Sequence, residues 1–215
     1  MDLLHFDRVG LGFDLTELVK TIGYVGIFAM IFAESGLFFG FFFPGDSLLF
    51  TAGFLASQNI LNIVILVPLV IVAAIGGDST GFWMGSKFAT WMMKQKESFF
   101  FKKEYIKKAH NFYAKYGGKA VILARFVAAV RTFVPIVAGM AEMEYRKFIS
   151  FNVIGGLLWG AGLTLSGYYL GRLIPEVDKY LLPIILVIII ASVAPGAWHL
   201  RKSILTKLKK FFKKP

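Results

Sequence analysis

Five apolar blocks follow one another along the chain, and their succession limits what this sequence can fold into. Soluble domains have about 45–50% apolar residues, whereas this chain has 57% and a mean hydropathy of +0.67. Lipid must cover segments of this length and composition. The sequence therefore predicts an all-α integral membrane protein. The blocks lie around residues 22–56, 62–76, 120–140, 148–171 and 181–198.

A single membrane domain is expected over residues 22–200, because only one substantial polar stretch, residues 94–119, interrupts the blocks. Residues 1–21 are polar and lack the basic start of a signal peptide. Their Leu and Phe spacing suits a short amphipathic helix at the membrane interface, and a frayed tail is the alternative. Residues 201–215 form a basic tail. The chain has no Cys, which excludes disulfides and Cys-ligated metals.

Two basic clusters account for most of the net charge of +11. One lies within residues 94–119 and the other within residues 201–214, and each flanks an apolar block. The positive-inside rule places both in the cytoplasm, so membrane orientation explains them better than nucleic-acid binding does. Aromatic side chains between the lysines of the first cluster favour an amphipathic helix at the cytoplasmic surface.

The predicted topology needs two hairpins that enter the membrane and return. The stretch from residue 119 to residue 201 must cross an even number of times but holds three apolar blocks, so residues 120–142 are expected to re-enter. Residues 22–56 need a second hairpin, because the turn at residues 57–62 is expected outside, as is the N-terminus. The residues expected to break these hairpins are Pro44, Gly45, Pro135 and Gly139.

An internal repeat supports two inverted halves. Ala33-Glu34 aligns with Ala124-Arg125, and Pro44 aligns with Pro135 at the same separation. Two inverted repeats, each with a re-entrant hairpin plus spanning helices, are the arrangement by which transporters place a site near the midplane. Chance similarity is the alternative. The Gly-rich runs within residues 76–85 and 155–171 indicate close helix packing rather than a phosphate-binding loop.

Five charged residues lie inside or beside the apolar blocks: Glu34, Asp46, Asp78, Arg125 and Arg131. A charge near the bilayer centre costs about 2.5–3.5 kcal/mol, so we expect opposite charges to meet where the hairpins meet. The two arginines suit an anion such as phosphate, and the three carboxylates suit proton exchange or a cation. A purely structural ion-pair network is the alternative.

These residues and their neighbours resemble the motifs of the DedA family, which is related to eukaryotic scramblases of the VTT-domain type. The resemblance implies opposed re-entrant hairpins, a bacterial inner membrane location, and movement of lipid across the bilayer. It also implies undecaprenyl phosphate as the best candidate substrate and dependence on the proton-motive force. The motifs are Glu34, Phe43-Pro44-Gly45-Asp46, Gly77-Asp78, Arg125, Arg131-Thr132-Phe133-Val134-Pro135 and Ala138-Gly139-Met140.

The resulting functional prediction is a multi-pass transporter of a phosphate-bearing lipid, coupled to the proton gradient. Arg125 and Arg131 would bind the phosphate, and Glu34, Asp46 and Asp78 would carry protons. A non-specific scramblase, a proton or cation antiporter and a lipid phosphatase are the alternatives. No cofactor, metal or nucleic acid is expected, and a homo-oligomer is left open. An enzyme is not expected, because the three histidines, His5, His110 and His199, fall away from the arginines.

Overall fold

The computed structural model describes residues 15–37, 44–94, 103–173, 183–184 and 186–187, and every element within this part is a helix. The all-α fold class is thereby confirmed. The helices are α1 (Leu15–Gly36), α2 (Gly45–Ser57), α3 (Ile63–Lys94), α4 (Lys103–Tyr116), α5 (Lys119–Ala124), α6 (Ala128–Arg131), α7 (Phe133–Met140), α8 (Tyr145–Gly156), the π-helical turn η2 (Leu157–Ala161) and α9 (Gly162–Leu173).

Three helical stretches among the described residues are long and apolar enough to cross a membrane: Val19–Gly36, Ile63–Lys94 and Tyr145–Leu173. The second covers residues 63–76 of the predicted block 62–76, and the third contains the predicted block 148–171. The first is 18 residues long, or about 27 Å at 1.5 Å per residue, so its length alone does not indicate a re-entrant segment. The expected crossing at residues 181–198 and the tail at residues 201–215 lie almost wholly outside the described residues.

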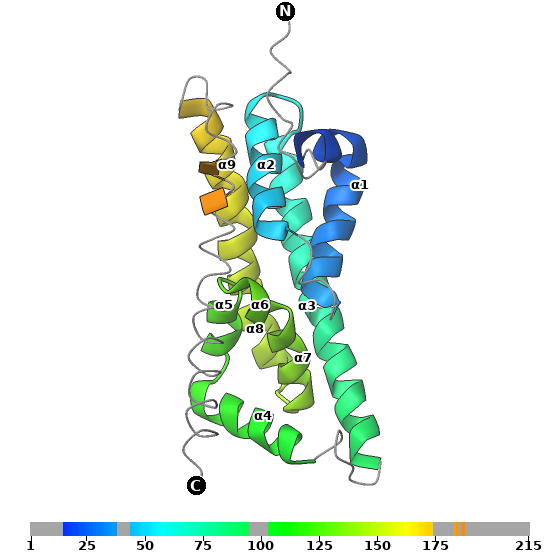
Figure 1. Ribbon diagram of the computed structural model, residues 1–215. Coiled ribbons are helices and arrows are strands. Elements are labelled where there is room, and N and C mark those ends of the chain that lie inside the picture. The colour runs from blue at the N-terminus through cyan, green and yellow to red at the C-terminus, as the bar shows by residue number, and fades with distance from the viewer. Residues whose placement is uncertain (1–14, 38–43, 95–102, 174–182, 185, 188–215) are drawn as a thin grey trace, which may run out of the picture.

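Helix α1 bends near its start, and most of the expected interfacial segment, residues 1–21, lies outside the described residues. Residues 1–14 are not described, and the helix begins at Leu15. Gly23 breaks it with a φ of 53°, a conformation that side chains rarely adopt. Figure 1 shows the first turns lying across the direction of the rest of α1. A glycine therefore bends the chain where the apolar helix begins.

One group of helices, α1 and α2, lies in the upper half of the molecule, and another, α5 to α7, lies in the lower half (Figure 1). Both groups pack against two long helical stretches, α3 and α8–η2–α9. Helix α1 descends from the upper end to the middle, and α2 returns upward. Helix α3 then runs the full length of the molecule, and α4 lies across the lower end. Helices α5 to α7 fill the lower half, and α8, η2 and α9 return to the top as one continuous stretch. The start of α2 and the end of α5 therefore both lie near the middle of the molecule.

Glycines bring the helices into backbone contact, as the Gly-rich runs predict. A side chain at Gly139 of α7 would overlap the carbonyl oxygen of Phe82, and one at Gly85 of α3 would overlap that of Ile136. Gly53 and Gly167 do the same between α2 and α9. Each of the two long helical stretches is thus packed closely against a short helix from the other half of the chain.

Gly139→Ala is expected to destabilise the protein, because the added methyl group meets backbone atoms that cannot turn aside. Overpacking of this kind costs about 1–3 kcal/mol. The matched control is Gly162→Ala in α9, where an added Cβ meets nothing within 4 Å. Thermal melting of the purified proteins should show a lower midpoint for Gly139→Ala alone. Equal midpoints for the two variants would contradict the close contact of α7 with α3.

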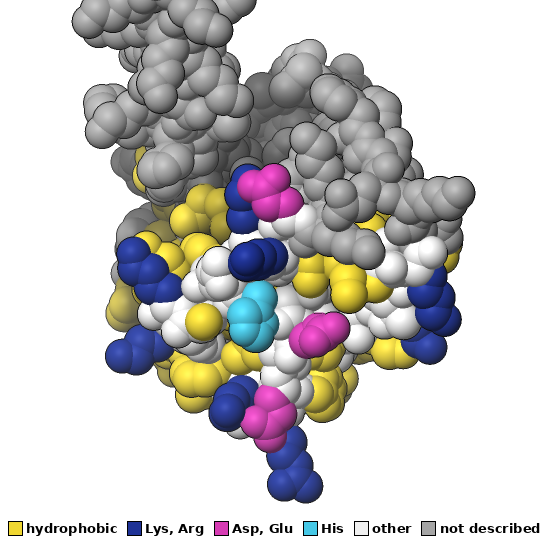
Figure 2. All heavy atoms as spheres, turned by 90° about the horizontal axis from the view of Figure 1, so that it is seen from below, with side chains coloured by type: hydrophobic (Ala, Val, Ile, Leu, Met, Phe, Trp, Pro, Cys, Tyr) yellow, Lys and Arg dark blue, Asp and Glu magenta, His cyan; other side chains and the backbone are white. Residues whose placement is uncertain are grey.

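Helix α4 closes the lower end of the molecule and carries many of the central lysines. Its apolar side packs inward through Ala109 and Tyr113, which are buried. The Tyr113 hydroxyl donates a hydrogen bond of 2.9 Å to the carbonyl oxygen of Val134 in α7. Burial raises the pKa of this phenol, and the charge of Asp78 raises it further, so Tyr113 stays protonated as a donor. Figure 2 shows the charged side chains spread over this face around a histidine.

Candidate functional site

All five charged residues predicted for the site are buried in the middle of the molecule. Their exposed fractions are 1% for Glu34, 9% for Asp46, 3% for Asp78, 4% for Arg125 and 7% for Arg131. Each guanidinium pairs with carboxylates from the first half of the chain. The prediction that opposite charges meet is therefore confirmed. They form two clusters, one around each arginine.

The first cluster is built on Arg131, the last residue of α6. Its Nη1 donates to Asp46 Oδ1 and its Nη2 to Glu34 Oε1, so one guanidinium bridges two carboxylates through separate nitrogens. Asp46 lies in the first turn of α2, where the free backbone amides favour a negative charge. Glu34 lies near the end of α1. This cluster ties α1 and α2 to α6.

Pro44 and Gly45 lie where the sequence predicts a break, directly before and at the start of α2. A side chain at Gly45 would overlap the carboxylate of Glu34, so only glycine leaves room for that acid. The prediction that Pro135 and Gly139 break the second hairpin is wrong, because both residues lie within α7. Proline is tolerated in a first helical turn, where its missing N–H is not needed. The breaks in this half lie instead at residues 125–127 and at Thr132.

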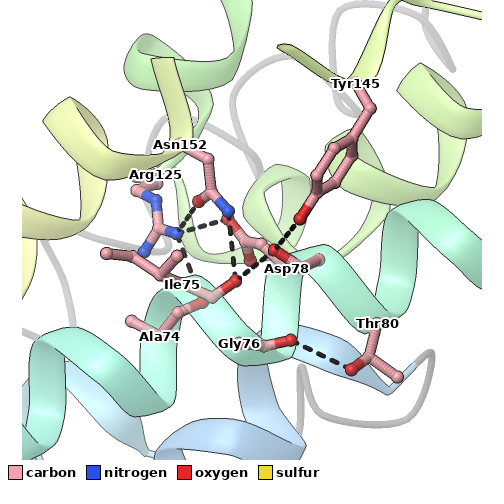
Figure 3. A network of polar contacts seen from close by, with 9 residues as sticks. Ala74, Ile75, Gly76, Asp78, Thr80, Arg125, Tyr145 and Asn152 are labelled. Carbon is pink, nitrogen blue, oxygen red and sulfur yellow. Dashed lines mark hydrogen bonds and ion pairs between the residues drawn. The ribbon is translucent and has the colours of Figure 1, made fainter. Parts of the chain in front are cut away.

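The second cluster is built on Arg125, which directly follows α5 (Figure 3). Its Nη2 donates to Asp78 Oδ2 of α3, to Asn152 Oδ1 of α8, and to the carbonyl oxygen of Ala74 at 3.4 Å. Asn152 also donates from Nδ2 to the carbonyl oxygen of Ile75 at 3.1 Å. Asn152 therefore fixes the position of Arg125 relative to α3.

Trp159 joins the two clusters. Its Nε1 donates a hydrogen bond of 2.8 Å to Asp46 Oδ1, and its ring centre lies 4.7 Å from Arg131 Cζ and 5.9 Å from Arg125 Cζ. Such distances allow a cation–π attraction of about 0.5–2 kcal/mol. Trp159 lies in η2, a π-helical turn, and these turns are frequent at functional sites. The indole thus contacts three of the five predicted charges.

Trp159 and Asn152 are site residues that were not predicted from the sequence. Both lie in the apolar block at residues 148–171, whose glycines indicated helix packing only. A buried Asn in a membrane helix and a Trp between glycines were the available signals, since polar groups in lipid need partners. Neither signal indicates which charge the side chain meets.

Several polar atoms at this site are buried without a hydrogen-bond partner among the described residues. They include Oε2 of Glu34 and Nε of both Arg125 and Arg131. Buried polar groups in folded proteins are normally satisfied, so unpartnered ones point to water, ions or ligands. Each arginine thus retains donor capacity beside its ion pairs.

Within the part of the chain that the structure describes, no group of three or more His, Cys, Asp or Glu is placed to hold a metal ion. Of the histidines, only His110 lies among the described residues. Its Nδ1 lies 3.3 Å from the carbonyl oxygen of Ala141, at the junction of α4 with the end of α7. It is not among the side chains that contact either arginine.

Several known proteins are similar to this chain. The VTT domain model matches residues 43–169. The chain is 45% identical to Protein DedA of Escherichia coli K12 over 91% of this chain and 93% of that protein. It is 42% identical to an uncharacterized membrane protein of Mycobacterium leprae over 79% and 77%, and 33% identical to the inner membrane protein YqjA of Escherichia coli K12 over 77% and 79%. No solved structure matches.

Proposed function

Because the chain belongs to the DedA family of VTT-domain membrane proteins, we propose that it moves a phosphate-bearing lipid across the bilayer in exchange for protons. It is a multi-pass inner membrane protein, in agreement with its long apolar helices and with the relatives named as membrane proteins. Undecaprenyl phosphate is the substrate we propose, and lipid transport without covalent chemistry is the proposed activity.

The proposed membrane arrangement has two inverted repeats. Helices α1 and α2 form one re-entrant hairpin from the periplasmic side, and α5 to α7 form the other from the cytoplasmic side. The exchanged glycine contacts support this pairing, because α2 packs on α9 through Gly53 and Gly167 while α7 packs on α3 through Gly139 and Gly85. Opposed hairpins that meet at charged residues would present the same site to either leaflet in turn.

The topology can be tested because the chain has no Cys of its own. Ile60→Cys should react with a membrane-impermeant maleimide from the periplasmic side, and Lys107→Cys only after the membrane is opened. Both positions are exposed, and Ile60 avoids the strained neighbour Asn59, whose φ is 61°. Labelling of Ile60→Cys only from the cytoplasm would contradict the inverted arrangement.

Phosphate binding is supported by the unused donors of the two arginines. Among the described residues, the Arg125 side chain donates to protein groups from Nη2 only, and its buried Nε has no partner there. Arg131 likewise has a buried Nε without a partner. A guanidinium offers five donors in a planar fork that matches phosphate oxygens. This spare donor capacity beside apolar helices is the observation that carries the proposal.

Proton coupling is supported by the balance of charge. In the part of the chain that the structure describes, the three buried carboxylates of Glu34, Asp46 and Asp78 face two buried guanidinium groups. One excess negative charge in a low-dielectric site is costly, and a bound proton removes it. A phosphate that enters the site adds negative charge and would bring further protons with it. The transported lipid and the proton are therefore expected to move together.

Flux measurements in liposomes test the proposal. The purified protein is reconstituted with labelled undecaprenyl phosphate, and its change of leaflet is followed with and without a pH gradient. Gradient-dependent movement is the expected result. Equal movement of phosphatidylcholine without a gradient would indicate a scramblase, and release of free phosphate would indicate a phosphatase. Either outcome would overturn the coupled transporter.

A further inference from the structure

A cavity of about 250 Å³ lies beside the charged site, between the stretch formed by η2 and α9 and the segment that follows α5. Arg125 and Asp46 lie at its polar end, and Trp159 forms part of its wall. The remaining wall is mainly apolar. It consists of Phe126, Leu158, Gly162, Leu163 and Ser166.

The rim of this cavity reaches the outer surface of the helices. Phe126 is 52% exposed and Leu158 is 54% exposed, whereas Trp159 between the two clusters is 2% exposed. Leu158 lies within a 29-residue stretch apolar enough to span a membrane. Its exposed surface therefore faces lipid rather than water. The cavity leads from an apolar surface to a buried arginine.

Gly162 lines this cavity and is exposed. It begins α9 directly after the π-helical turn, and an added Cβ there would meet nothing within 4 Å. The glycines that close the helix contacts behave differently, since added side chains at Gly53 and Gly167 would overlap backbone atoms of the facing helix. Gly162 thus borders open space where the other two make contacts.

We propose that this cavity is the lateral entrance of the transport site, where a lipid phosphate meets Arg125 while the apolar chain leaves between Phe126 and Leu158 into the bilayer. This inference rests on the proposed function and adds the route by which the substrate enters. A volume of about 250 Å³ is below the roughly 300–1,000 Å³ of pockets that enclose drug-sized ligands. The cavity therefore takes the headgroup and the start of one chain, and the bilayer holds the rest.

The chemistry of the lining matches such an amphipathic ligand. The charged end carries Arg125, whose guanidinium group is of the kind that binds phosphate oxygens. The Asp46 carboxylate at the same end would repel an anion when ionised, so entry of phosphate favours its protonation. Headgroup entry and proton uptake are thereby linked at one opening.

Gly162→Trp tests the entrance, because a large side chain at this position fills the cavity from its wall. Labelled undecaprenyl phosphate should cross the membrane at least tenfold more slowly than with the parent protein, at an unchanged melting temperature. Val72→Trp is the matched control for a bulky aromatic on a lipid-facing helix, because Val72 of α3 is 60% exposed and does not line the cavity.

Binding to the purified variants separates failure of this inference from failure of the proposed function. Labelled undecaprenyl phosphate should bind the parent and Val72→Trp alike and Gly162→Trp at least tenfold more weakly, and neither undecaprenol nor inorganic phosphate should compete effectively. If the parent transports lipid but Gly162→Trp matches it in flux and binding, the entrance lies elsewhere while the function stands. If inorganic phosphate competes as well as the lipid, the cavity is an anion site and not a lipid entrance. A parent that neither binds nor moves the lipid overturns both proposals.

Discussion

Arg131→Lys is expected to reduce lipid flux at least about tenfold while the protein still inserts and folds. The guanidinium uses Nη1 for Asp46 and Nη2 for Glu34, and a single ammonium group cannot reproduce this fork or offer the Nε edge to phosphate. A charge-assisted hydrogen bond contributes about 1.5–3 kcal/mol, and each 1.4 kcal/mol corresponds to a factor of about ten. Flux of labelled lipid into the opposite leaflet, measured at equal protein density, gives the effect.

Two further variants serve as controls for Arg131→Lys, one at an exposed arginine and one that removes the charge of Arg131. Arg146→Lys is the control, because Arg146 is exposed at the start of α8 and should tolerate the change. Arg131→Gln should lower the melting temperature as well as the flux, since it leaves two buried carboxylates without their cation, at a cost of about 3–5 kcal/mol. If Arg131→Lys transports like the parent, a positive charge alone is sufficient and the fork has no role.

The charged residues of the site could be identified from sequence, because a charged residue within a membrane helix usually has either a functional role or an ion-pair partner. Their pairing could not be assigned in the same way. Arg131 meets acids 85 and 97 residues away, and Arg125 meets one 47 residues away. Which residues pair depends on the position of each short helix along the long helix beside it. Glycine contacts such as that of Gly139 with Phe82 set this position.

The long helices were predictable for a related reason, since composition alone separates a 32-residue apolar helix such as α3 from its surroundings. The second hairpin was harder. Pro135 was expected at a break but lies in the first turn of α7, where proline fits a helix. The chain breaks instead around Arg125 and Thr132, without a glycine or proline at either point. Tertiary contacts of the two arginines hold these breaks, and local sequence carries no signal for them.

Trp159 contacts both ion-pair clusters. A π-helical turn changes the direction of the side chains that follow it, and here it brings the indole against Asp46 and both guanidinium groups. Any movement of α2 relative to α6 would change the bond to Asp46 and the contact with Arg131 together. The two ion-pair clusters therefore share Trp159 as a common contact, which is what the proposed alternating transport would require.

Glu34→Gln is expected to abolish the dependence of transport on a pH gradient while leaving the protein as stable as the parent. The site has three carboxylates for two guanidinium groups, so removing one charge leaves Arg131 still paired with Asp46. Glutamine keeps the size of the side chain and accepts the same hydrogen bond, but it cannot carry a proton. Asp46→Asn should behave alike in coupling, with some added loss of stability because Trp159 donates to this carboxylate.

The double variant Glu34→Gln/Asp46→Asn separates proton carriage from charge balance. It leaves Arg131 buried without an anion, which should cost about 3–5 kcal/mol and lower the melting temperature by several degrees. Lys147→Gln is a suitable control, because its pair with Glu144 is exposed and contributes little. Melting temperature and gradient-driven flux are measured on the same preparations. Stable single variants with uncoupled flux support a proton carried by these acids. Single variants that are as unstable as the double would mean that both carboxylates serve only to hold Arg131. Unchanged coupling in Glu34→Gln and in Asp46→Asn would show that the proton travels by another route.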